Sequence, residues 1–583
     1  MRSTQSWAGS PVLVGGDGAH PGIGPGSGPP SQCEGSPVDD SLAPSPVVEL
    51  LVVVDALVSG DAVVSAGPLA FVALLGSAVV SASEPVVSPL VPIDSLSASS
   101  SPEKQAETAP NDEARTKYLI PAVEHDEHIL YNAWAVTPIA RGARRRNFSP
   151  QVVAVKALRT IDRTRGFSNR VVGDLLERAE DLAPGARALV TALVYGVLRH
   201  RSRLDAHIDA RARDPKSLGA VPRELLRVGA YEILELGRPP GNAIGHAVAA
   251  ARSFDPSRAL SGLVHGVLAA VADGGAELDA KHEAAAPLEA LDKRWSIPRW
   301  IAGRWIKQLG AERATLRARR FAEVPSVDLR VDLSRIDLDT AHARLLEERP
   351  DATIGRVADQ PQALRVRSGG DIFFGPLHDD GLISVQGLAA QQPAIALDPR
   401  AGQRVLDACA GIGVKTLQLA ELMLRTGVIV AADLEPGKLA EQTRMRARGR
   451  LDGDGLELRF VAADLAVACP ELEAFSPFDA VLLDVPCTGL GNLSRHPEIR
   501  WHREHADIAG AAALQAALLA NVATHVRPGG RLVYAVCSPE PEEGPQSVHA
   551  FVADAPFALK AERTWTPEDD ATEGFYLATL VRN

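Results

Sequence analysis

The sequence predicts a multidomain protein with a disordered N-terminal leader that lacks a hydrophobic core, an all-helical domain and a final α/β domain built on a parallel sheet. Residues 1–110 are rich in Gly, Pro, Ser, Val and Ala and poor in aromatic residues, a composition that cannot offset the entropy cost of ordering. From Phe148, apolar residues recur at helical spacing. After residue 404, short apolar runs that end at Asp or Cys alternate with helical segments, as in an α/β sheet.

We assign residues 1–140 to a disordered, low-complexity leader. Its most membrane-like stretch, Ala62–Ser83, carries no charge over 22 residues, which is long enough to span a bilayer. Gly67, Pro68 and Gly76 interrupt this stretch and no basic residues flank it, so we expect no membrane anchor. The first 30 residues contain no apolar core, so we expect no secretory signal, and a mispredicted start codon would account for the whole leader.

Charge is distributed unevenly along the chain. The formal net charge is −12, but residues 1–140 alone hold 4 basic against 16 acidic residues, so the remainder is balanced. Residues 141–275 hold 22 basic against 13 acidic residues, a net charge of +9. A basic module suits a domain that contacts phosphate, although solvated helix faces explain the same excess. The arginine-rich run 141–146 could contact phosphate nonspecifically, or it could equally be a solubilising linker.

Residues 146–275 predict the all-helical domain. The first helix shows apolar residues three or four apart: Val152, Val155, Leu158 and Ile161. Ala188–His200 and Glu224–Leu234 predict two more helices of the same kind. Helices of this length with short connections pack as a bundle-like domain.

Residues 276–380 predict a linker and a small α/β subdomain. Residues 276–300 form an Ala/Glu-rich connection, which a short helix at Pro298–Trp305 and a strand at Val327–Asp332 follow. The large α/β domain is then expected to occupy residues 381–583.

Three predicted strands of the large domain end on an acid: Arg404–Asp407, Val428–Asp433 and Leu458–Asp464. Gly411 and Gly413 follow the first strand, so backbone N–H groups at a helix start can approach a bound carboxylate. A single Gly-x-Gly is weak evidence, and one strand-end Asp is often only a helix cap. Three acids in register favour a ligand site.

Two further strands lead to cysteines. The run Phe478–Asp484 precedes Cys487, and the run Leu532–Val536 precedes Cys537. Because the carboxyl ends of parallel strands meet at the edge where α/β sheets bind ligands, we expect the two thiols to lie together there. Either cysteine alone is equally well explained as a small buried hydrophobe. Pro486 and the glycine-containing residues after Cys487, however, force an irregular loop at this edge.

These segments resemble the RNA 5-methylcytosine methyltransferases that use S-adenosylmethionine, in the bacterial branch of small-subunit ribosomal RNA methyltransferase B. The family has Asp-x-Pro-Cys-(Ser/Thr)-Gly after one strand and Thr-Cys-Ser-x-x-Pro-Glu-Glu after another, and this chain has matching segments at Asp484–Gly489 and Val536–Glu543. Arg495–Trp501 and Glu573–Ala578 also resemble family segments. Within the helical region, Ala188–His200 and Leu225–Leu234 resemble helices of the NusB fold, the N-terminal domain of this branch.

The resemblance implies a NusB-like domain followed by a Rossmann-like class I methyltransferase domain, with S-adenosyl-L-methionine as cofactor. It implies cofactor contacts from Asp407, Ala408, Cys409, Ala410, Gly411, Ile412, Gly413, Lys415, Asp433, Lys438, Asp464 and Asp484. The family reads Cys-Ala-Ala-Pro-Gly-Gly-Lys-Thr in this loop, so Gly411, Ile412 and Val414 depart from the pattern and put the mode of binding in question. Cys409 is expected to be structural. Gly387 stands where the family has a helix-capping Asp.

The resemblance also assigns roles to the two cysteines. Carbon 5 of cytosine is a poor nucleophile, so a thiolate must first add to carbon 6, which splits one difficult step into two easier ones. The resemblance implies that Cys537 adds to carbon 6, that Cys487 assists release, and that Asp484 lies near the cytosine ring edge. The target base must leave its stack to reach them.

The expected partner is RNA, ribosomal RNA foremost, and we expect a monomer. The cysteine spacings fit no zinc site, so we expect no metal, and five scattered cysteines imply a reducing cytoplasm without a disulfide framework. Two alternatives remain: a methyltransferase acting on transfer RNA or protein, and a noncatalytic RNA-binding scaffold. The intact Cys487 and Cys537 speak against the scaffold.

Overall fold

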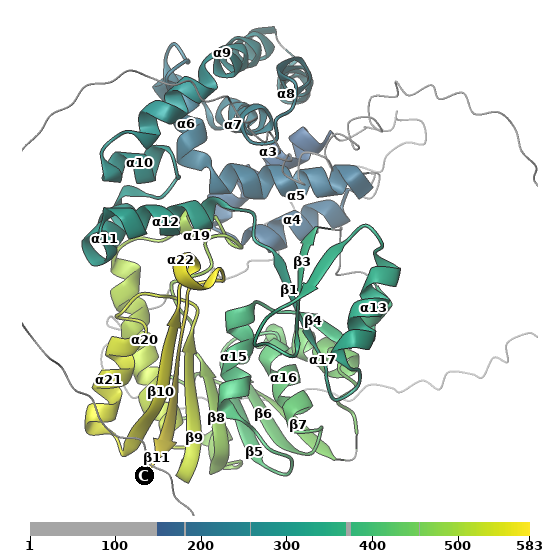
Figure 1. The fold of residues 1–583 in the computed structure, drawn as a ribbon, viewed down its shortest axis with the longest axis vertical. Helices are drawn as coiled ribbons and strands as arrows, with labels where there is room; N and C mark the ends of the chain where they lie inside the picture. The colour runs from purple at the N-terminus through teal and green to yellow at the C-terminus, as the bar shows by residue number, and fades with distance from the viewer. Residues whose placement is uncertain (1–148, 180–181, 183, 257, 369–374, 454) are drawn as a thin grey trace, which may run out of the picture. The chain divides into compact units, whose positions relative to one another are not determined.

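The computed structural model describes residues 149–583, apart from 180–181, 183, 257, 369–374 and 454 (Figure 1). All described residues belong to one compact unit. The predicted leader, residues 1–140, and its apolar stretch Ala62–Ser83 lie outside the described residues.

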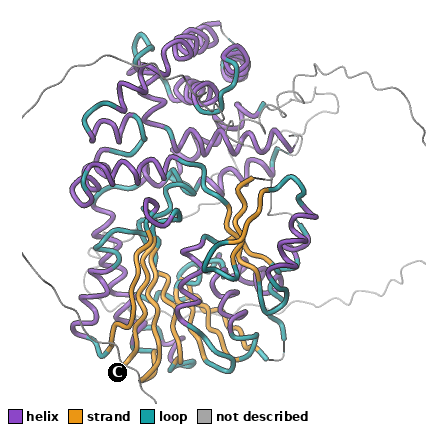
Figure 2. Tube along the Cα trace, in the orientation of Figure 1, coloured by secondary structure: helices purple, strands orange, loops and turns teal. Residues whose placement is uncertain are grey.

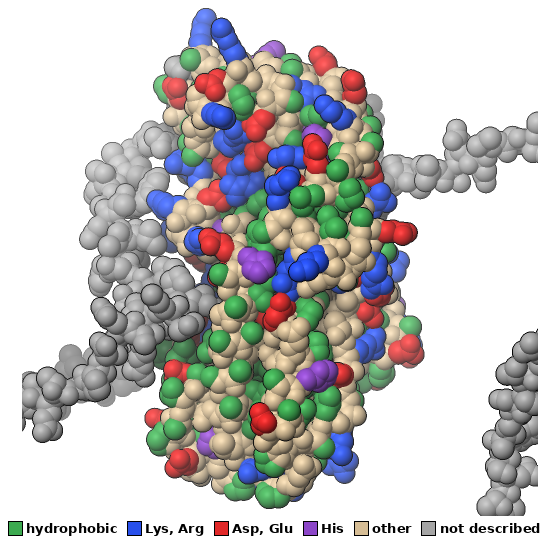
Figure 3. Space-filling model, turned by 90° about the vertical axis from the view of Figure 1, so that its left-hand side faces the viewer, with side chains coloured by type: hydrophobic (Ala, Val, Ile, Leu, Met, Phe, Trp, Pro, Cys, Tyr) green, Lys and Arg blue, Asp and Glu red, His purple; other side chains and the backbone are tan. Residues whose placement is uncertain are grey.

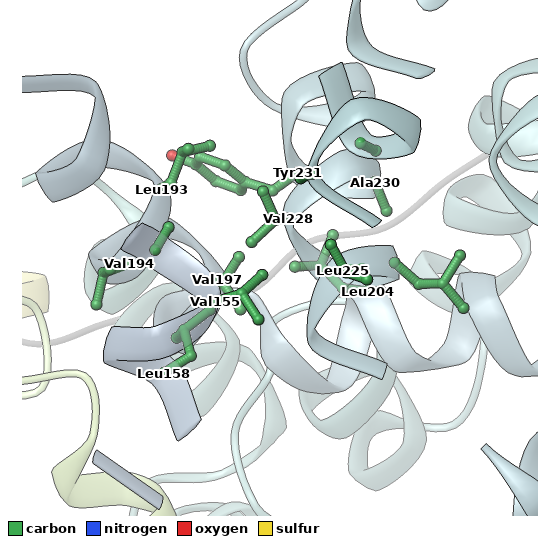
Figure 4. Close-up of a cluster of buried hydrophobic side chains, with 14 of the residues drawn as sticks. Val155, Leu158, Leu193, Val194, Val197, Leu204, Leu225, Val228, Ala230 and Tyr231 are labelled. Atoms are coloured by element: carbon green, nitrogen blue, oxygen red, sulfur yellow. The ribbon is translucent and has the colours of Figure 1, made fainter. Parts of the chain in front are cut away.

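The N-terminal described region is helical, as predicted. Its helices are α3 (Pro150–Thr164), α4 (Ser168–Glu177), α5 (Pro184–Arg199), α6 (Arg201–Asp209), α7 (Ala220–Leu234), α8 (Pro240–Phe254) and α9 (Arg258–Glu283), with a short 3₁₀ helix at Pro215–Ser217. Ser149 caps α3 by accepting a hydrogen bond from the Val152 N–H group, and Pro150 starts the helix. Figure 4 shows apolar side chains of α3, α5 and α7, among them Val155, Val197 and Val228, facing one shared core.

The predicted connection 276–300 is largely helical in the structure. α9 continues past the predicted domain boundary to Glu283, with non-helical backbone angles at Gly274. α10 (Pro287–Lys293), α11 (Arg299–Leu309) and α12 (Ala311–Ala322) follow. Trp305 and Phe321 of these helices share a core with Leu490 and Leu493 of the C-terminal domain. The linker is therefore packed against the domain that it precedes.

A small antiparallel sheet with strand order β2-β3-β1-β4 comes next. Its strands are β1 (Val327–Val331), β2 (Thr353–Arg356), β3 (Ala363–Ser368) and β4 (Ile383–Val385), with helices α13 (Leu338–Glu348) and α14 (Pro376–Asp379). One face packs Leu329 and Val366 against Leu345 of α13. β4 lies beyond residue 380, so this sheet extends past the boundary expected from the sequence.

The C-terminal domain contains a seven-stranded sheet of order β10-β11-β9-β8-β5-β6-β7 (Figures 1 and 2). Its strands are β5 (Arg404–Ala408), β6 (Gly427–Asp433), β7 (Leu456–Ala462), β8 (Phe478–Asp484), β9 (Val526–Val536), β10 (Phe557–Trp565) and β11 (Phe575–Arg582). The pairs from β7 through β9 are parallel, and β11 is antiparallel to β9 and β10. The Rossmann-like prediction is confirmed.

Helices cover both faces of this sheet (Figure 1). The helices of this domain are α15 (Leu388–Leu397), α16 (Val414–Leu422), α17 (Lys438–Arg448), α18 (Pro470–Glu473), α19 (Ile499–His502), α20 (Ala506–Ala523), α21 (Pro545–Asp554) and α22 (Pro567–Asp570), of which α19 and α22 lie near α12 rather than on the sheet. Alternate strand residues divide between two cores: Val405 packs with Leu417 of α16, and Leu406 packs with Leu518 of α20. Burial on both faces explains why these strands are continuously apolar.

α9 and α20 are the two helices in the described part of the chain that are long and apolar enough to cross a membrane. Val264 of α9 lies in the helical-domain core, and Leu519 of α20 lies in a sheet core. A core helix of a folded domain meets the same criteria.

Candidate functional site

The two cysteines singled out in the sequence lie together. β8 and β9 are parallel neighbours with Asp484 opposite Ala535, so the residues that follow emerge at the same sheet edge. The Sγ atoms of Cys487 and Cys537 are 2.7 Å apart, close enough for one thiol to donate a hydrogen bond to the other sulfur. This hydrogen bond, together with burial, raises the pKa of Cys487 well above its ordinary value.

The buried carboxylate of Glu543 links the two thiol loops, the segments that contain Cys487 and Cys537. Oε2 of Glu543 accepts hydrogen bonds from the Thr488 N–H group at 2.8 Å and from Gln515 Nε2 at 3.2 Å. Oε1 accepts from the Ser538 hydroxyl at 2.6 Å and from the Thr488 hydroxyl. Thr488 follows Cys487 and Ser538 follows Cys537, so one side chain joins the residues next to both thiols.

Gly491 brings the Cys487 loop close to its neighbours. Its N–H donates to the Cys537 carbonyl at 3.2 Å, and its own carbonyl accepts from Gly574 N–H at 2.9 Å. A Cβ atom at 491 would overlap the Gly574 backbone. Only glycine permits this approach.

Asp484, at the end of β8, forms an ion pair with Lys415, with 2.6 Å between Oδ2 and Nζ. Burial disfavours the charged form of Lys415, but the carboxylates of Asp484 and Asp407 outweigh burial and raise the pKa of this lysine. A persistent positive charge therefore lies at the sheet edge, beside the Asp484 carboxylate, three residues before Cys487.

Near its end, just before the glycine loop, β5 carries a second buried carboxylate, Asp407. Its Oδ2 accepts a hydrogen bond from the Thr416 hydroxyl at 2.6 Å, whereas its Oδ1 is buried without a partner. Burial raises the pKa of Asp407 to about 7. Cys409 in this loop adopts a left-handed backbone conformation, and burial raises the pKa of its thiol.

Asp433, at the end of β6, is hydrogen-bonded to the glycine loop, the segment between β5 and α16 that contains Gly411 and Gly413. Its Oδ2 accepts from the Gly411 N–H group at 2.8 Å, and its Oδ1 accepts from Glu435 N–H and Lys438 Nζ, each at 3.0 Å. Gln442 of α17 donates to the Gly411 carbonyl at 2.7 Å. A carboxylate offers about four lone-pair positions, so Asp433 retains one acceptor position for a ligand.

The other residues predicted to contact the cofactor lie at the end of β5 or in the loop that follows it. Ala408 ends β5, Ala410 N–H donates to the Ala432 carbonyl at 2.9 Å, and Gly413 precedes α16 with a positive φ of 93°. Ile412 is 45% exposed, unusual for isoleucine. The loop is thus anchored at Ala410 and presents an apolar side chain outward.

Asp464 was predicted to end a strand, but it lies beyond the end of β7. β7 stops at Ala462, two residues earlier, and Asp464 lies exposed in the following turn. Its Oδ1 accepts from the Ala466 N–H group at 3.0 Å, which is the local capping interaction that aspartate makes in turns.

Sequence reasoning missed several side chains that hold the site together: Thr416, Gln442, Gln515 and Ser538, and the role of Glu543. Ser538 and Glu543 belong to the motif around Cys537 and Thr416 to the family pattern of the glycine loop, whereas Gln442 and Gln515 lie outside the motifs. Among the described residues, no group of three or more His, Cys, Asp or Glu side chains could hold a metal ion.

The segment Arg495–Trp501 joins the two domains. The buried Arg500 guanidinium donates to four carbonyls, those of Arg199, Ser296, Phe321 and Leu493, at 2.9 to 3.3 Å. These acceptors belong to α5, to the linker, to the end of α12 and to the C-terminal domain. One side chain therefore connects the successive parts of the described chain.

Two contacts beside Arg500 reach the helical domain directly. Trp501 Nε1 donates to the Leu198 carbonyl at 2.7 Å. Glu498 accepts from the Ser168 N–H and hydroxyl groups at 3.0 and 2.8 Å.

A NusB-type helical domain joined to an α/β domain with this strand order defines a two-domain methyltransferase. The model of the family described as 16S rRNA methyltransferase RsmB/F matches residues 394–581, and that of the NusB family matches residues 149–273. Ribosomal RNA small subunit methyltransferase B of Klebsiella pneumoniae is 30% identical over 451 residues, 75% of this chain and 99% of the relative. That of Shigella boydii is 32% identical over 409 residues, 68% and 90% of the respective chains.

The chain belongs to this family of 16S ribosomal RNA methyltransferases with an N-terminal NusB domain, so the resemblance seen in the sequence is confirmed. The solved structure of PH0851 covers 75% of this chain and all of its own, with a TM-score of 0.61 and 23% identity. At that identity the likeness concerns the fold alone.

Proposed function

We propose that this protein is an S-adenosylmethionine-dependent RNA cytosine-5 methyltransferase that modifies a specific cytosine of small-subunit ribosomal RNA. The observation that carries the proposal is the thiol pair, Cys487 and Cys537, with 2.7 Å between the sulfurs at the ligand-binding edge of the sheet. A methyltransferase acting on a nucleophilic oxygen or nitrogen has no use for a thiol, whereas carbon 5 of cytosine requires one.

In the proposed reaction, the Cys537 thiolate forms a bond to carbon 6 of cytosine, and the electron pair of the 5,6 double bond makes carbon 5 nucleophilic. Carbon 5 then forms a bond to the methyl group that S-adenosylmethionine would supply, whose bond to the sulfonium sulfur would break and leave S-adenosylhomocysteine. A base removes the carbon 5 proton, the 5,6 double bond re-forms, and the bond to Cys537 breaks. Cys487 assists this release.

The geometry supports these roles for the two thiols. The hydrogen bond to Cys537, burial and the nearby Glu543 charge all raise the pKa of Cys487, so Cys487 retains its proton. A retained proton suits the partner that assists release rather than the attacking thiolate. Asp484, oriented by Lys415, is proposed to contact the ring edge of the cytosine.

The residues near the glycine loop fit S-adenosylmethionine, which supplies an electrophilic methyl group. A Cβ atom at Gly411 would meet nothing within 4 Å, so there is open space beside the loop. Asp433 has one acceptor position left for a ribose hydroxyl, and Asp407 Oδ1 is a buried acceptor without a partner among the described residues. Ile412, Leu434 and Val467, all exposed, follow the neighbouring strands β5, β6 and β7 and can cover an adenine ring. Asp464 is proposed to meet its amino group.

The helical domain is proposed to bind the RNA. On the face shown in Figure 3, Lys and Arg side chains gather mainly over the upper, helical part, interspersed with Asp and Glu. Basic residues near phosphate would give salt-dependent affinity without specifying sequence. The target cytosine is proposed to leave its stack to reach Cys537. We further propose that the protein acts as a monomer in the cytoplasm.

Bisulfite sequencing of ribosomal RNA tests the proposal. RNA from a strain without this gene should lose one 5-methylcytosine of the small subunit, and the wild-type gene, but not Cys537→Ala, should restore it. Loss of a mark from transfer RNA or protein instead would identify the alternative substrate. A phenotype rescued by Cys537→Ala, with no lost mark, would favour the noncatalytic scaffold.

A further inference from the structure

We propose that Glu543 is a positioning residue of this reaction, which holds Cys487 against Cys537 so that the covalent RNA adduct can be released. The inference rests on the proposed function, because it concerns the second half of the two-thiol mechanism. Glu543 is fully buried, and it accepts hydrogen bonds from Thr488 and Ser538, the residues that follow the two cysteines, through which we propose that it acts.

The two thiols are held in different ways. Cys537 follows β9, which pairs on one side with β8 and on the other with β11, up to Val536 opposite Tyr576. Its position is therefore fixed by the sheet. Cys487 lies in an irregular segment between Pro486 and Gly489, outside any strand. Its position depends on side-chain contacts.

Glu543 provides most of those contacts. It accepts from both the N–H and hydroxyl groups of Thr488. It also holds Gln515 at 3.2 Å, and Gln515 donates in turn to the Pro486 carbonyl at 2.9 Å. The residues on both sides of Cys487 thus depend on Glu543. The remaining tie to Thr488 is a hydrogen bond from Arg503 Nε to its carbonyl at 3.0 Å.

Removal of the carboxylate should therefore displace Cys487 and leave Cys537 in place. Addition to carbon 6 and methyl transfer need only Cys537, so they should continue, whereas release should slow. A displacement of roughly 1 Å can slow a step by about 10²-fold. Glu543→Ala should consequently accumulate a protein–RNA conjugate, as Cys487→Ala should.

The substitution Glu543→Gln distinguishes the effect of the hydrogen-bond geometry from the effect of the carboxylate charge. The two donors on the Oε2 side are N–H groups, whereas the two on the Oε1 side are hydroxyls, which can also accept. An amide with its oxygen toward Thr488 N–H and Gln515, and its NH₂ toward the hydroxyls of Thr488 and Ser538, keeps a hydrogen bond to each of these groups. Glu543→Gln should therefore retain release.

The test incubates the full-length variants with small-subunit ribosomal RNA and labelled S-adenosylmethionine, then quantifies RNA-linked protein on denaturing gels. Glu542→Ala is the matched control, because Glu542 pairs with Arg304 of α11 rather than with a thiol loop. Glu543→Ala should raise the labelled conjugate at least roughly tenfold over wild type, and Glu543→Gln and Glu542→Ala should not. Circular dichroism verifies that each variant folds.

The outcomes separate this inference from the proposed function. If Cys487→Ala gives no conjugate, the proposed function fails and the inference with it. If Cys487→Ala gives a conjugate and folded Glu543→Ala gives none, the positioning role alone is wrong. A conjugate from Glu543→Gln would assign the effect to charge and overturn the positioning role. Should Glu543→Ala not fold, Glu543→Asp, one methylene too short to reach both loops, should accumulate the conjugate, and its absence would contradict the inference.

Discussion

The Glu573 side chain occupies the space in which a side chain at Gly387 would lie. Gly387 is the N-cap of α15 and offers no side chain to cap it, but Glu573 Oε1 accepts from the Ala390 N–H group, in the first turn, at 3.2 Å. A Cβ atom at 387 would overlap this carboxylate. The missing cap is therefore supplied from the segment just before β11, 183 residues away from Ala390.

A double-mutant cycle tests whether Glu573 supplies the cap that Gly387 lacks. Glu573→Ala should lower the free energy of unfolding by about 1 kcal/mol, the usual value of an N-cap. Gly387→Asp should also destabilise, because it places a second carboxylate against Glu573. Combined, the two changes should recover stability, because the space beside residue 387 is then free and the introduced aspartate caps α15 itself. Additive losses in urea unfolding would contradict the account.

Arg500 should be far more important for stability than an exposed arginine. Arg500→Met keeps length and removes the donors, which leaves four carbonyls without their partner and should cost about 3 kcal/mol or more. Arg444, exposed and paired with Glu441 on the surface of α17, is the control, and Arg444→Met should cost about 0.5 kcal/mol or less. Equal losses in denaturant unfolding would show that Arg500 does not join the domains.

The strand ends that carry Asp433 and Asp484 could be predicted from the sequence, because buried parallel strands read as unbroken apolar runs. β9 was predicted from Leu532 but starts at Val526. Pro528 and Gly529 are typical of a turn, yet they form an irregularity within the strand, where the register moves from Phe478–Val526 to Ala480–Arg531. Local composition does not distinguish a turn from such a bulge.

Contacts between distant residues could not be predicted in this way. Thr488 lies 55 residues from Glu543, and Arg199 lies 301 residues from Arg500. No periodicity relates such positions, because only the assembled fold brings them together. The motif after Cys537 indicated that Glu543 matters without indicating what it touches.

Asp407 should make stability depend on pH. Burial raises its pKa to about 7 in the folded protein, against about 3.9 in an unfolded chain. Between these values the unfolded chain releases the proton and the folded protein retains it, so the free energy of unfolding falls as pH rises toward 7. From pH 5 to pH 8 this loss is up to about 3 kcal/mol, at about 1.4 kcal/mol per pKa unit.

Asp407→Asn cannot ionise but can still accept the Thr416 hydrogen bond. Its unfolding free energy, measured in urea at pH 5 and pH 8, should fall less than that of the wild type. Parallel pH dependence in the two proteins would show that Asp407 has an ordinary pKa.

Asp433→Ala should weaken S-adenosylmethionine binding. The change removes the proposed ribose acceptor and also frees the Gly411 N–H group and Lys438. Loss of a charged hydrogen bond predicts a roughly 10- to 100-fold increase in Kd by calorimetry. Glu441→Ala, at a half-exposed position on α17 where the side chain pairs with Arg444, is the control. Unchanged affinity would show that Asp433 only braces the glycine loop.

The most direct test of the central claim compares the two thiols on denaturing gels after incubation with ribosomal RNA and labelled S-adenosylmethionine. Cys537→Ala should abolish methylation without trapping RNA, because no bond to carbon 6 can form. Cys487→Ala should form the adduct, transfer the methyl group and stall as a labelled conjugate. A conjugate from Cys537→Ala and none from Cys487→Ala would reverse the roles, and full methylation by both variants would contradict the covalent mechanism.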